Sequence, residues 1–406
     1  MGNEPDARFC IAVDESLYQV EFIAAISQFS KENWNRLMRD SNPFNRYEYL
    51  AALESSGCVC TKTGWTPMHM LVRKVNGDEI DDVIAVMPLY IKAHSYGEYI
   101  FDWAWADAYE RHQIPYYPKL LAAIPFTPVT GMRLGSIFEH TSLQQQALWQ
   151  VVNQALTRCL ADYGFSSWHC LFLPRSQFTQ LSKQQNLQRL STQFHWFNRN
   201  YADFNHFLDS LTSRKRKDIK KERQKVSRVG LTFEFVEGDA VTTELWQHFY
   251  ACYQSTYAKR SGHYGYLNLE FFEAIGSTLS EQIVLLLVRD PQRQIIASAL
   301  YFKSATHLYG RYWGALVDVD GLHFEACYYQ GIEYCIANKL QVFDAGAQGE
   351  HKVSRGFQPV ETYSNHEVAH GEFRSAIESF TQQEAQNIKI YMQQLKAKLP
   401  YKHQSC

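Results

Sequence analysis

Apolar positions in the second half of the chain follow two different periods. The segments IVLLLVRD, IIASALYFK and THLYGRYWGAL are short, rich in β-branched and aromatic residues and bounded by turn residues, which is typical of β-strands. FYACYQSTYAKR and LEFFEAIGSTL before them, and FEACYYQGIEYCIANK after them, have helical spacing, and LQVFDAG predicts a final strand. The predicted order is therefore helix, helix, strand, strand, strand, helix, strand.

The first half repeats much of this order. NRYEYLAALESSG predicts a helix, PMHMLVRK, VIAVMPLYIK and GEYIFDWAWA predict strands, SLQQQALWQVVNQALTRCLADYG a long helix and SSWHCLFLP a strand. IAVMPLYIK at 84–92 and IASALYFK at 296–303 even align by letter. This repetition predicts two related α/β domains (α+β by some schemes), at residues 1–200 and 231–370, followed by a C-terminal helix at 371–406. The alternative is a single long α+β domain.

A basic segment, predicted as a connecting helix at 201–230, separates the two halves. Its bases are Arg214, Lys215, Arg216, Lys217, Lys220, Lys221, Arg223 and Lys225. At 100° per residue they go round the helix, which favours a solvated connection. The alternative is a surface within 213–225 that binds phosphates, such as those of a coenzyme or a tRNA.

Composition narrows the class of protein. The 406 residues are 46% hydrophobic and 20% charged, and the net charge of -2 gives no general reason to bind nucleic acid. No apolar run is long enough for a membrane span, and the first residues carry no secretion or lipid signal, so we expect a cytoplasmic protein. We expect no metal site, because Cys58 and Cys60 lack a C-x-x-C partner and His323 and Glu325 lack metal spacing.

The stretch FDAGAQGEHKVSRG at 343–356 is the first candidate site, because it holds more chemically active side chains than a turn needs. They are Gln348, Glu350, His351, Lys352 and Arg355. The histidine and glutamate are candidate bases, the glutamine a candidate donor to a carbonyl, and the lysine and arginine candidate anion-binding groups. We expect these charged groups to be exposed, and Asp344 at the strand end to be buried and paired. The alternative is a plain turn in which Asp344 and Arg355 form a structural pair.

Further candidate substrate-binding residues lie elsewhere. Arg311 and Trp313 belong to the strand RYWGAL, whereas Asp102, Trp103, Tyr116, Tyr117 and Lys119 belong to the first half. If the strand GEYIFDWAWA continues, Asp102 faces away from Trp103. The long, proline-rich stretch around Lys119 is predicted as an irregular loop that lines a cleft, and a core beneath the loop is the alternative.

Three long motifs resemble those of the FemAB-like family, often described by peptidoglycan biosynthesis or recognition and placed in the GNAT N-acyltransferase superfamily. They are FDWAWADAYERHQIPYYPKLLAAIPFTPVTGMRLG, RYWGALVDVDGLHFEACYYQGIEYCIANK and FDAGAQGEHKVSRGFQPVETYS. The resemblance implies two tandem GNAT-like domains and transfer of an acyl or aminoacyl group, from acyl-CoA or aminoacyl-tRNA, to a small amine or amino-acid-like acceptor. The alternative is a non-catalytic recognition protein that keeps the two-domain cleft.

One departure from the superfamily pattern concerns the donor. Enzymes that use acetyl-CoA usually carry [QR]-x-x-G-x-[GA] after the fourth strand, where backbone N–H groups hold the pyrophosphate. This chain has GALVDVDGLHFE there, so Asp318, Asp320 and Glu325 would place negative charge near the phosphates. The sequence therefore disfavours acetyl-CoA and leaves the donor unnamed.

Overall fold

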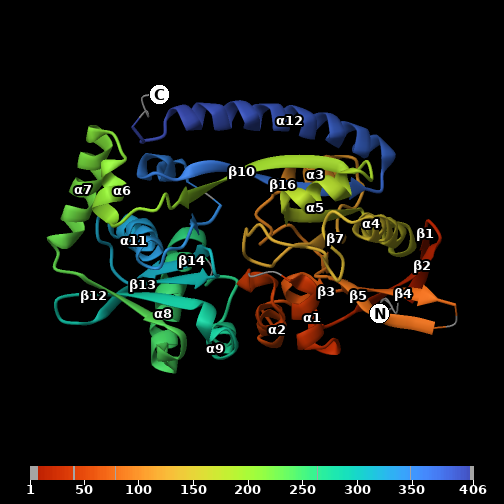
Figure 1. Cartoon of the computed structure of the whole chain (residues 1–406), viewed down its shortest axis with the longest axis horizontal. Helices are drawn as coiled ribbons and strands as arrows, with labels where there is room; N and C mark the ends of the chain where they lie inside the picture. The colour runs from red at the N-terminus through yellow and green to blue at the C-terminus, as the bar shows by residue number, and fades with distance from the viewer. Residues whose placement is uncertain (1–7, 40–41, 78, 263, 348, 403–406) are drawn as a thin grey trace. The chain divides into compact units, whose positions relative to one another are not determined.

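The computed structural model describes residues 8–39, 42–77, 79–262, 264–347 and 349–402, and the chain divides into two compact units (Figure 1). The first unit comprises residues 1–191 and 361–388, and the second comprises 192–360 and 389–406. Each unit is discontinuous in sequence, whereas the ranges expected from the sequence were consecutive. The basic segment 201–230 lies inside the second unit.

The second unit is built on one sheet. Its strands are, in spatial order, β11 (Thr232–Glu237), β12 (Ile283–Arg289), β13 (Ile295–Lys303), β14 (His307–Ala315), β15 (Val342–Asp344) and β10 (Leu187–Phe197), which begins in the first unit. β14 and β15 are parallel, and their other neighbours are antiparallel. The predicted strands β12, β13, β14 and β15 are confirmed, while β10 and β11 were not predicted.

Helices cover both faces of this sheet (Figure 1). They are α8 (Thr243–Ser261) and α9 (Leu269–Thr278) on one face, and α10 (Leu322–Phe324), the π-helical turn Glu325–Tyr329 and α11 (Gln330–Ala337) on the other. A side chain at Gly314 would place its Cβ 1.9 Å from the carbonyl oxygen of Cys252, so only glycine lets α8 pack this closely on β14. α6 (Phe204–Asp209) and α7 (Ser213–Ser227) complete the unit before β11.

The first unit contains strands in two sheets. One sheet has the order β1 (Arg8–Val13), β2 (Ser16–Ile23), β4 (His69–Asn76), β5 (Glu79–Met87) and β8 (Gly135–Ser136). The other has the order β3 (Trp65–Pro67), β6 (Tyr90–Lys92), β7 (Lys119–Ala122), β9 (Ser167–Leu173) and β16 (Gln358–Val368), which begins in the second unit. β7 and β9 are parallel, and β16 is antiparallel to β9.

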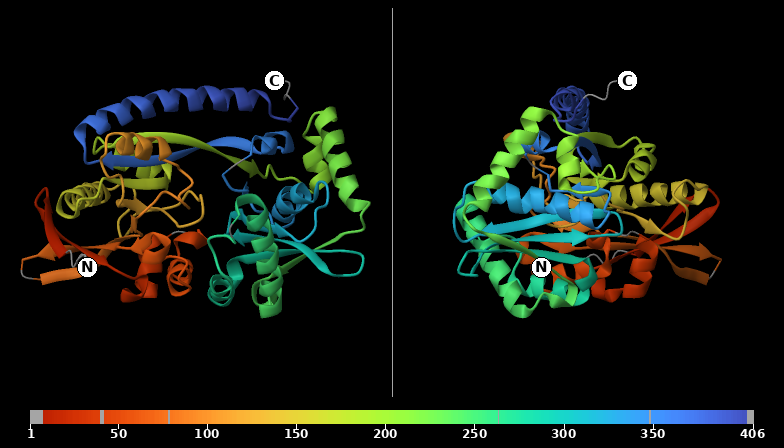
Figure 2. Two further views of the ribbon diagram at one scale, coloured as in Figure 1. Left: turned by 180° about the vertical axis from the view of Figure 1, so that it is seen from behind. Right: turned by 60° about the vertical axis from the view of Figure 1, so that its left-hand side comes forward.

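The helices of the first unit are α1 (Lys31–Met38), α2 (Tyr47–Ser55), α3 (Trp103–Arg111), α4 (Leu143–Tyr163), α5 (Arg175–Ser182) and α12 (Gly371–Ala397), which ends in the second unit. α4 packs against β1 and β9 (Figure 2). It begins at the cap Ser142, whose side chain accepts from the N–H of Gln145, and ends at Gly164 in the left-handed conformation.

Two predicted strands of the first unit differ in the structure. VIAVMPLYIK at 83–92 is not one strand but divides into the end of β5 and all of β6, which lie in different sheets. Residues 103–111 of GEYIFDWAWADAYER form helix α3 instead of continuing a strand. Trp105 and Tyr109 are four residues apart, and both are buried, which is a helical pattern. The alternation of tryptophan and alanine is too short to distinguish the two structures.

Within the part of the chain that the structure describes, no helix is long and apolar enough to cross a membrane.

Candidate functional site

The second unit presents its candidate site where β14 and β15 stop pairing. Their parallel register ends with Tyr309 opposite Asp344, after which β14 continues to Ala315 while β15 stops. Asp344 is therefore the last residue of its strand, and the chain leaves the sheet at the edge where open α/β sheets commonly bind ligands.

Asp344 is buried and paired, as the sequence predicted. The guanidinium of Arg311, on β14, donates to Asp344 Oδ2 at 2.6 Å and to Oδ1 at 3.2 Å. The Nε2 atom of His195, on β10, lies 3.8 Å from Oδ1. Burial is the largest single influence and raises the pKa of Asp344, but the charges of Arg311 and His195, together with the hydrogen bonds from Arg311 and the Gly346 N–H, outweigh it and hold the pKa below the ordinary value. Asp344 and Arg311 form an ion pair that fixes the end of β15 to β14.

Lys352 is buried, contrary to our expectation of an exposed charge. Only 1% of the residue is exposed, and its ammonium donates to the carbonyl oxygens of Ala345 and Gly346 at 2.8 and 2.7 Å. Burial lowers its pKa to about 8. Lys352 therefore holds the start of the loop instead of presenting its charge to solvent.

His351 is exposed, and its imidazole is the accessible candidate base of this loop. Its Nε2 atom is 2.9 Å from the hydroxyl of Tyr328, in the π-helical turn, and its ring lies 5.5 Å from that of Phe324. A side chain at Gly349 would place its Cβ 2.4 Å from the imidazole, so glycine is needed for the ring to lie there. Burial, followed by the charges of Arg355 and Lys352, lowers the pKa of His351, so the imidazole is neutral at pH 7.

The remaining charged residues of the loop have partners of their own. Arg355 NH2 donates to Glu222 Oε1 on α7 at 2.9 Å, and its Nε donates to the hydroxyl of Tyr329 at 3.1 Å. Glu350 accepts from the hydroxyl of Tyr391, on α12, at 2.6 Å. Arg355 therefore pairs with Glu222, and the alternative of a structural pair with Asp344 is wrong. Gln348 lies outside the described residues.

Trp313 lies apart from the ion pair although it is two residues from Arg311 on the same strand. It lines a separate cavity of about 340 Å³ with His323, whose ring centroid is 5.8 Å away, and with Asp318 and Asp320. Lys259 contacts Asp318 at 3.4 Å. Two exposed carboxylates therefore occupy the segment where acetyl-CoA enzymes present backbone N–H groups.

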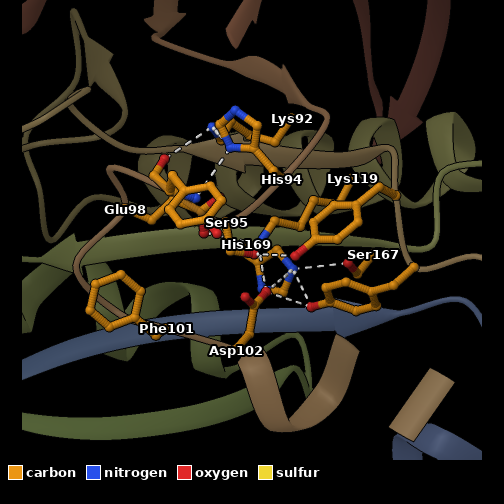
Figure 3. A network of polar contacts seen from close by, with 12 residues as sticks. Lys92, His94, Ser95, Glu98, Phe101, Asp102, Lys119, Ser167 and His169 are labelled. Carbon is orange, nitrogen blue, oxygen red and sulfur yellow. Dashed lines mark hydrogen bonds and ion pairs between the residues drawn. The ribbon is translucent and has the colours of Figure 1, made fainter. Parts of the chain in front are cut away.

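The first unit contains a second, buried cluster of polar side chains (Figure 3). Lys119, at the start of β7, is fully buried, and its ammonium donates to Ser95 Oγ at 2.8 Å, Glu98 Oε2 at 2.9 Å and Asp102 Oδ2 at 2.5 Å. The hydroxyl of Tyr116 donates to the same oxygen of Asp102 at 2.6 Å. The structure thus brings together the predicted residues Asp102, Tyr116 and Lys119, in the interior and not in an exposed loop.

Two neutral histidines extend this cluster. His169 Nδ1, on β9, lies 2.6 Å from His366 Nδ1, on β16, and His169 Nε2 lies 2.9 Å from Ser167 Oγ. Burial lowers the pKa of His169 to about 3 and that of His366 well below its ordinary value. The histidines therefore act as uncharged hydrogen-bonding groups.

Glu98 and Lys92 have strongly perturbed pKa values in the same region. Burial raises the pKa of Glu98 to about 7 and lowers that of Lys92 to about 7. The Lys92 ammonium lies over the ring of Trp65 at 3.7 Å. Such perturbation occurs at functional sites and in structural ion networks alike, and complete burial favours a structural network here.

The other two predicted residues of the first unit lie nearer the surface. Trp103 is exposed and stacks on Phe101, with ring centroids 5.7 Å apart, while the hydroxyl of Tyr117 is 2.9 Å from Ser95 Oγ. The helical conformation at α3 separates Trp103 from the buried Asp102.

Several residues at the two clusters were not predicted from the sequence. They are Ser95, Glu98, His169, His195, His366, Glu222, Tyr328 and Tyr329. A histidine in the apolar strand SSWHCLFLP was a usable signal, because a polar residue in a buried strand needs a partner. The other pairings join residues up to 197 positions apart, and no local pattern carries that information.

Among the described residues, no group of three or more histidine, cysteine, aspartate or glutamate side chains could hold a metal ion.

Comparisons with known proteins identify the family to which the chain belongs. The model of the FemAB-like family, described by peptidoglycan biosynthesis/recognition, matches residues 25–403. The chain belongs to the FemAB-like family. Among curated protein sequences, none matches this FemAB-like chain.

Solved structures agree with this membership at the level of the fold. The crystal structure of FemX is similar with a TM-score of 0.51 and 12% identity, covering 86% of this chain and 98% of FemX. The structure of L-PGS from Bacillus licheniformis has a TM-score of 0.48 and 10% identity, covering 84% of this chain and 97% of the other. At this identity the likeness to FemX shows the fold alone, and it confirms the predicted two-domain α/β class.

Proposed function

We propose that this FemAB-like protein is an N-acyltransferase that moves an acyl or aminoacyl group onto the amine of a small, amino-acid-like acceptor. The observation that carries the proposal is the exposed His351, which is hydrogen-bonded to the buried Tyr328 near the end of β15, in a chain whose family is described by peptidoglycan biosynthesis/recognition. An ammonium acceptor must lose a proton before it attacks a carbonyl, and a neutral imidazole is suited to take it at pH 7.

The proposed reaction uses His351 as general base. Nε2–H of the imidazole donates to the Tyr328 oxygen, which leaves Nδ1 to accept the proton of the ammonium. The neutral amine then attacks the ester or thioester carbonyl, and the tetrahedral intermediate expels the alcohol or thiol, which takes the proton back from the imidazolium. The nitrogen of the new amide releases its remaining extra proton to water. The Arg311–Asp344 pair and the Lys352 contacts are proposed to hold the loop so that the imidazole keeps its place.

The donor is proposed to be an aminoacyl ester of tRNA or an acyl-CoA other than acetyl-CoA. Asp318 and Asp320 carry side chains that are 95% and 83% exposed, and each pairs with a lysine, Lys259 or Lys225. The segment after β14 therefore presents paired carboxylates where a pyrophosphate needs free N–H groups or cations. An aminoacyl ester does not need that position.

The test is a transfer assay with the purified protein. Aminoacyl-tRNA or acyl-CoA is supplied as donor, amine-bearing peptidoglycan precursors are supplied as acceptors, and the product is identified by mass spectrometry. We expect His351→Ala to lower the rate by roughly 10²–10⁴-fold. His248→Ala, on the exposed face of α8, is the matched control and should retain the full rate. Equal rates for the two variants would refute the role of His351.

A non-catalytic recognition protein is the second candidate, and the acidic segment around Asp318 favours it. In that case the acceptor should bind with unchanged affinity in His351→Ala, and no donor should support transfer at any pH.

A further inference from the structure

Helix α7 carries the basic segment, and six of its eight bases fall into two groups. The other two, Arg214 and Lys215, lie in the first turn of the helix and form no ion pair with any residue that the structure describes. The first group has acidic partners: Arg216 donates to Asp209 at 2.5 Å, Lys225 donates to Asp320 at 2.9 Å, and Arg223 forms a double ion pair with two glutamates. These glutamates are Glu325, which is buried, and Glu333. The charge of this group is therefore neutralised within the second unit.

The second group consists of Lys217, Lys220 and Lys221. All three are exposed, and none forms an ion pair with any residue that the structure describes. Their spacing of three and four residues places them on one face of α7. The bases do go round the helix, as the sequence indicated, but pairing of Arg216, Arg223 and Lys225 leaves Lys217, Lys220 and Lys221 as an unpaired stripe along one face.

This stripe borders a cavity of about 780 Å³, which is within the usual size range of small-molecule sites. Its opposite walls are aromatic or apolar and come from α6 and β11: Phe204, Leu208, Leu231 and Phe233. The one carboxylate at the wall is that of Glu325, and Arg223 holds it at 3.0 and 2.8 Å, so it adds no free negative charge. The cavity therefore offers three unpaired cations facing rings and aliphatic side chains.

We propose that this groove binds a phosphate-bearing nucleotide, with its phosphates against Lys217, Lys220 and Lys221 and its base against the wall of Phe204 and Phe233. Lysine side chains on one face of a helix bind phosphates as point charges, and aromatic rings stack on bases of any sequence. The inference deepens the proposed function, since it rests on that function for taking the nucleotide as the carrier of the acyl donor. The nucleotide belongs either to the end of an RNA or to a free nucleotide.

Binding is measured by fluorescence anisotropy with a labelled single-stranded oligoribonucleotide, with ADP as competitor. We expect the triple variant Lys217→Gln, Lys220→Gln, Lys221→Gln to bind at least about 10-fold more weakly and the salt slope of log K to decrease by about 2. The matched control is Lys389→Gln, Lys396→Gln, Lys398→Gln, which removes the same charge from exposed positions on α12 and directly after it. The control should change affinity less than about twofold.

The outcomes separate the sources and the two proposals. If ADP displaces the labelled oligonucleotide at similar concentrations, the ligand is a free nucleotide. If ADP displaces it only weakly, the ligand is the end of an RNA. Equal weakening of both triple variants, or no binding of either probe, overturns the site. His351→Ala should bind the oligonucleotide normally, so a protein that binds through α7 but transfers nothing refutes only the proposed function.

Discussion

In the first unit, β7, β9 and β16 lie side by side, with β7 parallel to β9 and β16 antiparallel to it. In the second unit β14, β15 and β10 repeat this arrangement. We call three residues that are paired across these three strands a row. In the first unit, the row has His169 at its centre, between Leu121 and His366. In the second unit, the row has Asp344 at its centre, between Tyr309 and His195. The same three-strand pattern thus carries a neutral histidine in one unit and a charged carboxylate in the other.

The surroundings of these central residues differ in accessibility. In the first unit, the ammonium of Lys119 pairs with one oxygen each of Glu98 and Asp102 in the interior. In the second unit, the Arg311–Asp344 pair is also buried, but the following loop carries the exposed His351. A buried network can stabilise a fold but cannot meet a substrate without opening, so the comparison favours the second unit as the place of the chemistry.

The largest effect is expected from Lys119→Met in the first unit. Removing the cation leaves two buried carboxylates without their partner, which should lower the free energy of unfolding by about 3–5 kcal/mol. Urea unfolding measures this, with the exposed Lys183→Met as control. A loss below about 1 kcal/mol would show that the network does not stabilise the first unit.

Asp344→Asn should cost less, about 3 kcal/mol, because the amide oxygen still accepts from Arg311 while the buried guanidinium loses its counter-charge. The matched control is Asp318→Asn, which should change stability by no more than about 0.5 kcal/mol. If the two variants are equally stable, the central carboxylate of the second unit is not structural and the comparison between the rows fails.

The pH dependence of stability sharpens the comparison in the first unit. Burial raises the pKa of Glu98 from 4.5 to about 7, so the folded protein keeps a proton that the unfolded chain releases between these values. Stability contributed by this group is therefore present below pH 4.5 and is lost as the pH rises towards 7.

Glu98→Gln removes this dependence. The difference in free energy of unfolding between the variant and the wild type should shift in favour of the variant by about 2 kcal/mol from pH 5 to pH 7. Urea titration at both pH values measures it. Glu110→Gln, an exposed position on α3, should gain nothing. A constant difference between Glu98→Gln and wild type at the two pH values would contradict the raised pKa.

The smallest effects concern neighbouring residues of the second unit. Lys352→Ala leaves the carbonyls of Ala345 and Gly346 without their donor and should cost about 1–2 kcal/mol, whereas His351→Ala should cost no more than about 0.5 kcal/mol. Thermal unfolding of the two variants compares them directly. A Tm of Lys352→Ala equal to that of His351→Ala would mean that the ammonium does not hold the loop.

Local patterns predicted a large part of the fold. The strands β12, β13 and β14 and the helices α4, α8 and α9 carry their own periodicity, so each could be recognised without its neighbours. The letter match between 84–92 and 296–303 was informative only in part. β6 at 90–92 lies beside β7 as β13 lies beside β14, but residues 84–87 belong to β5 in the other sheet. α3 failed because its tryptophans mimic alternation, and β10 and β16 were missed because their polar residues hide the pattern.

For the candidate site, the sequence by itself determined which side chains are available and that Asp344 ends a buried strand. Only the tertiary structure decided which of them are accessible. Lys352 turns inward onto the carbonyls of Ala345 and Gly346 in its own loop, and Arg355 pairs with Glu222 on α7, whereas His351 stays exposed. The same holds for α7, where the sequence set the number of bases, long-range pairs with Asp320, Glu325 and Glu333 neutralised Lys225 and Arg223, and the fold placed the unpaired Lys217, Lys220 and Lys221 along one cavity. Charge is a property of residues, but pairing and burial depend on contacts between residues far apart in the chain.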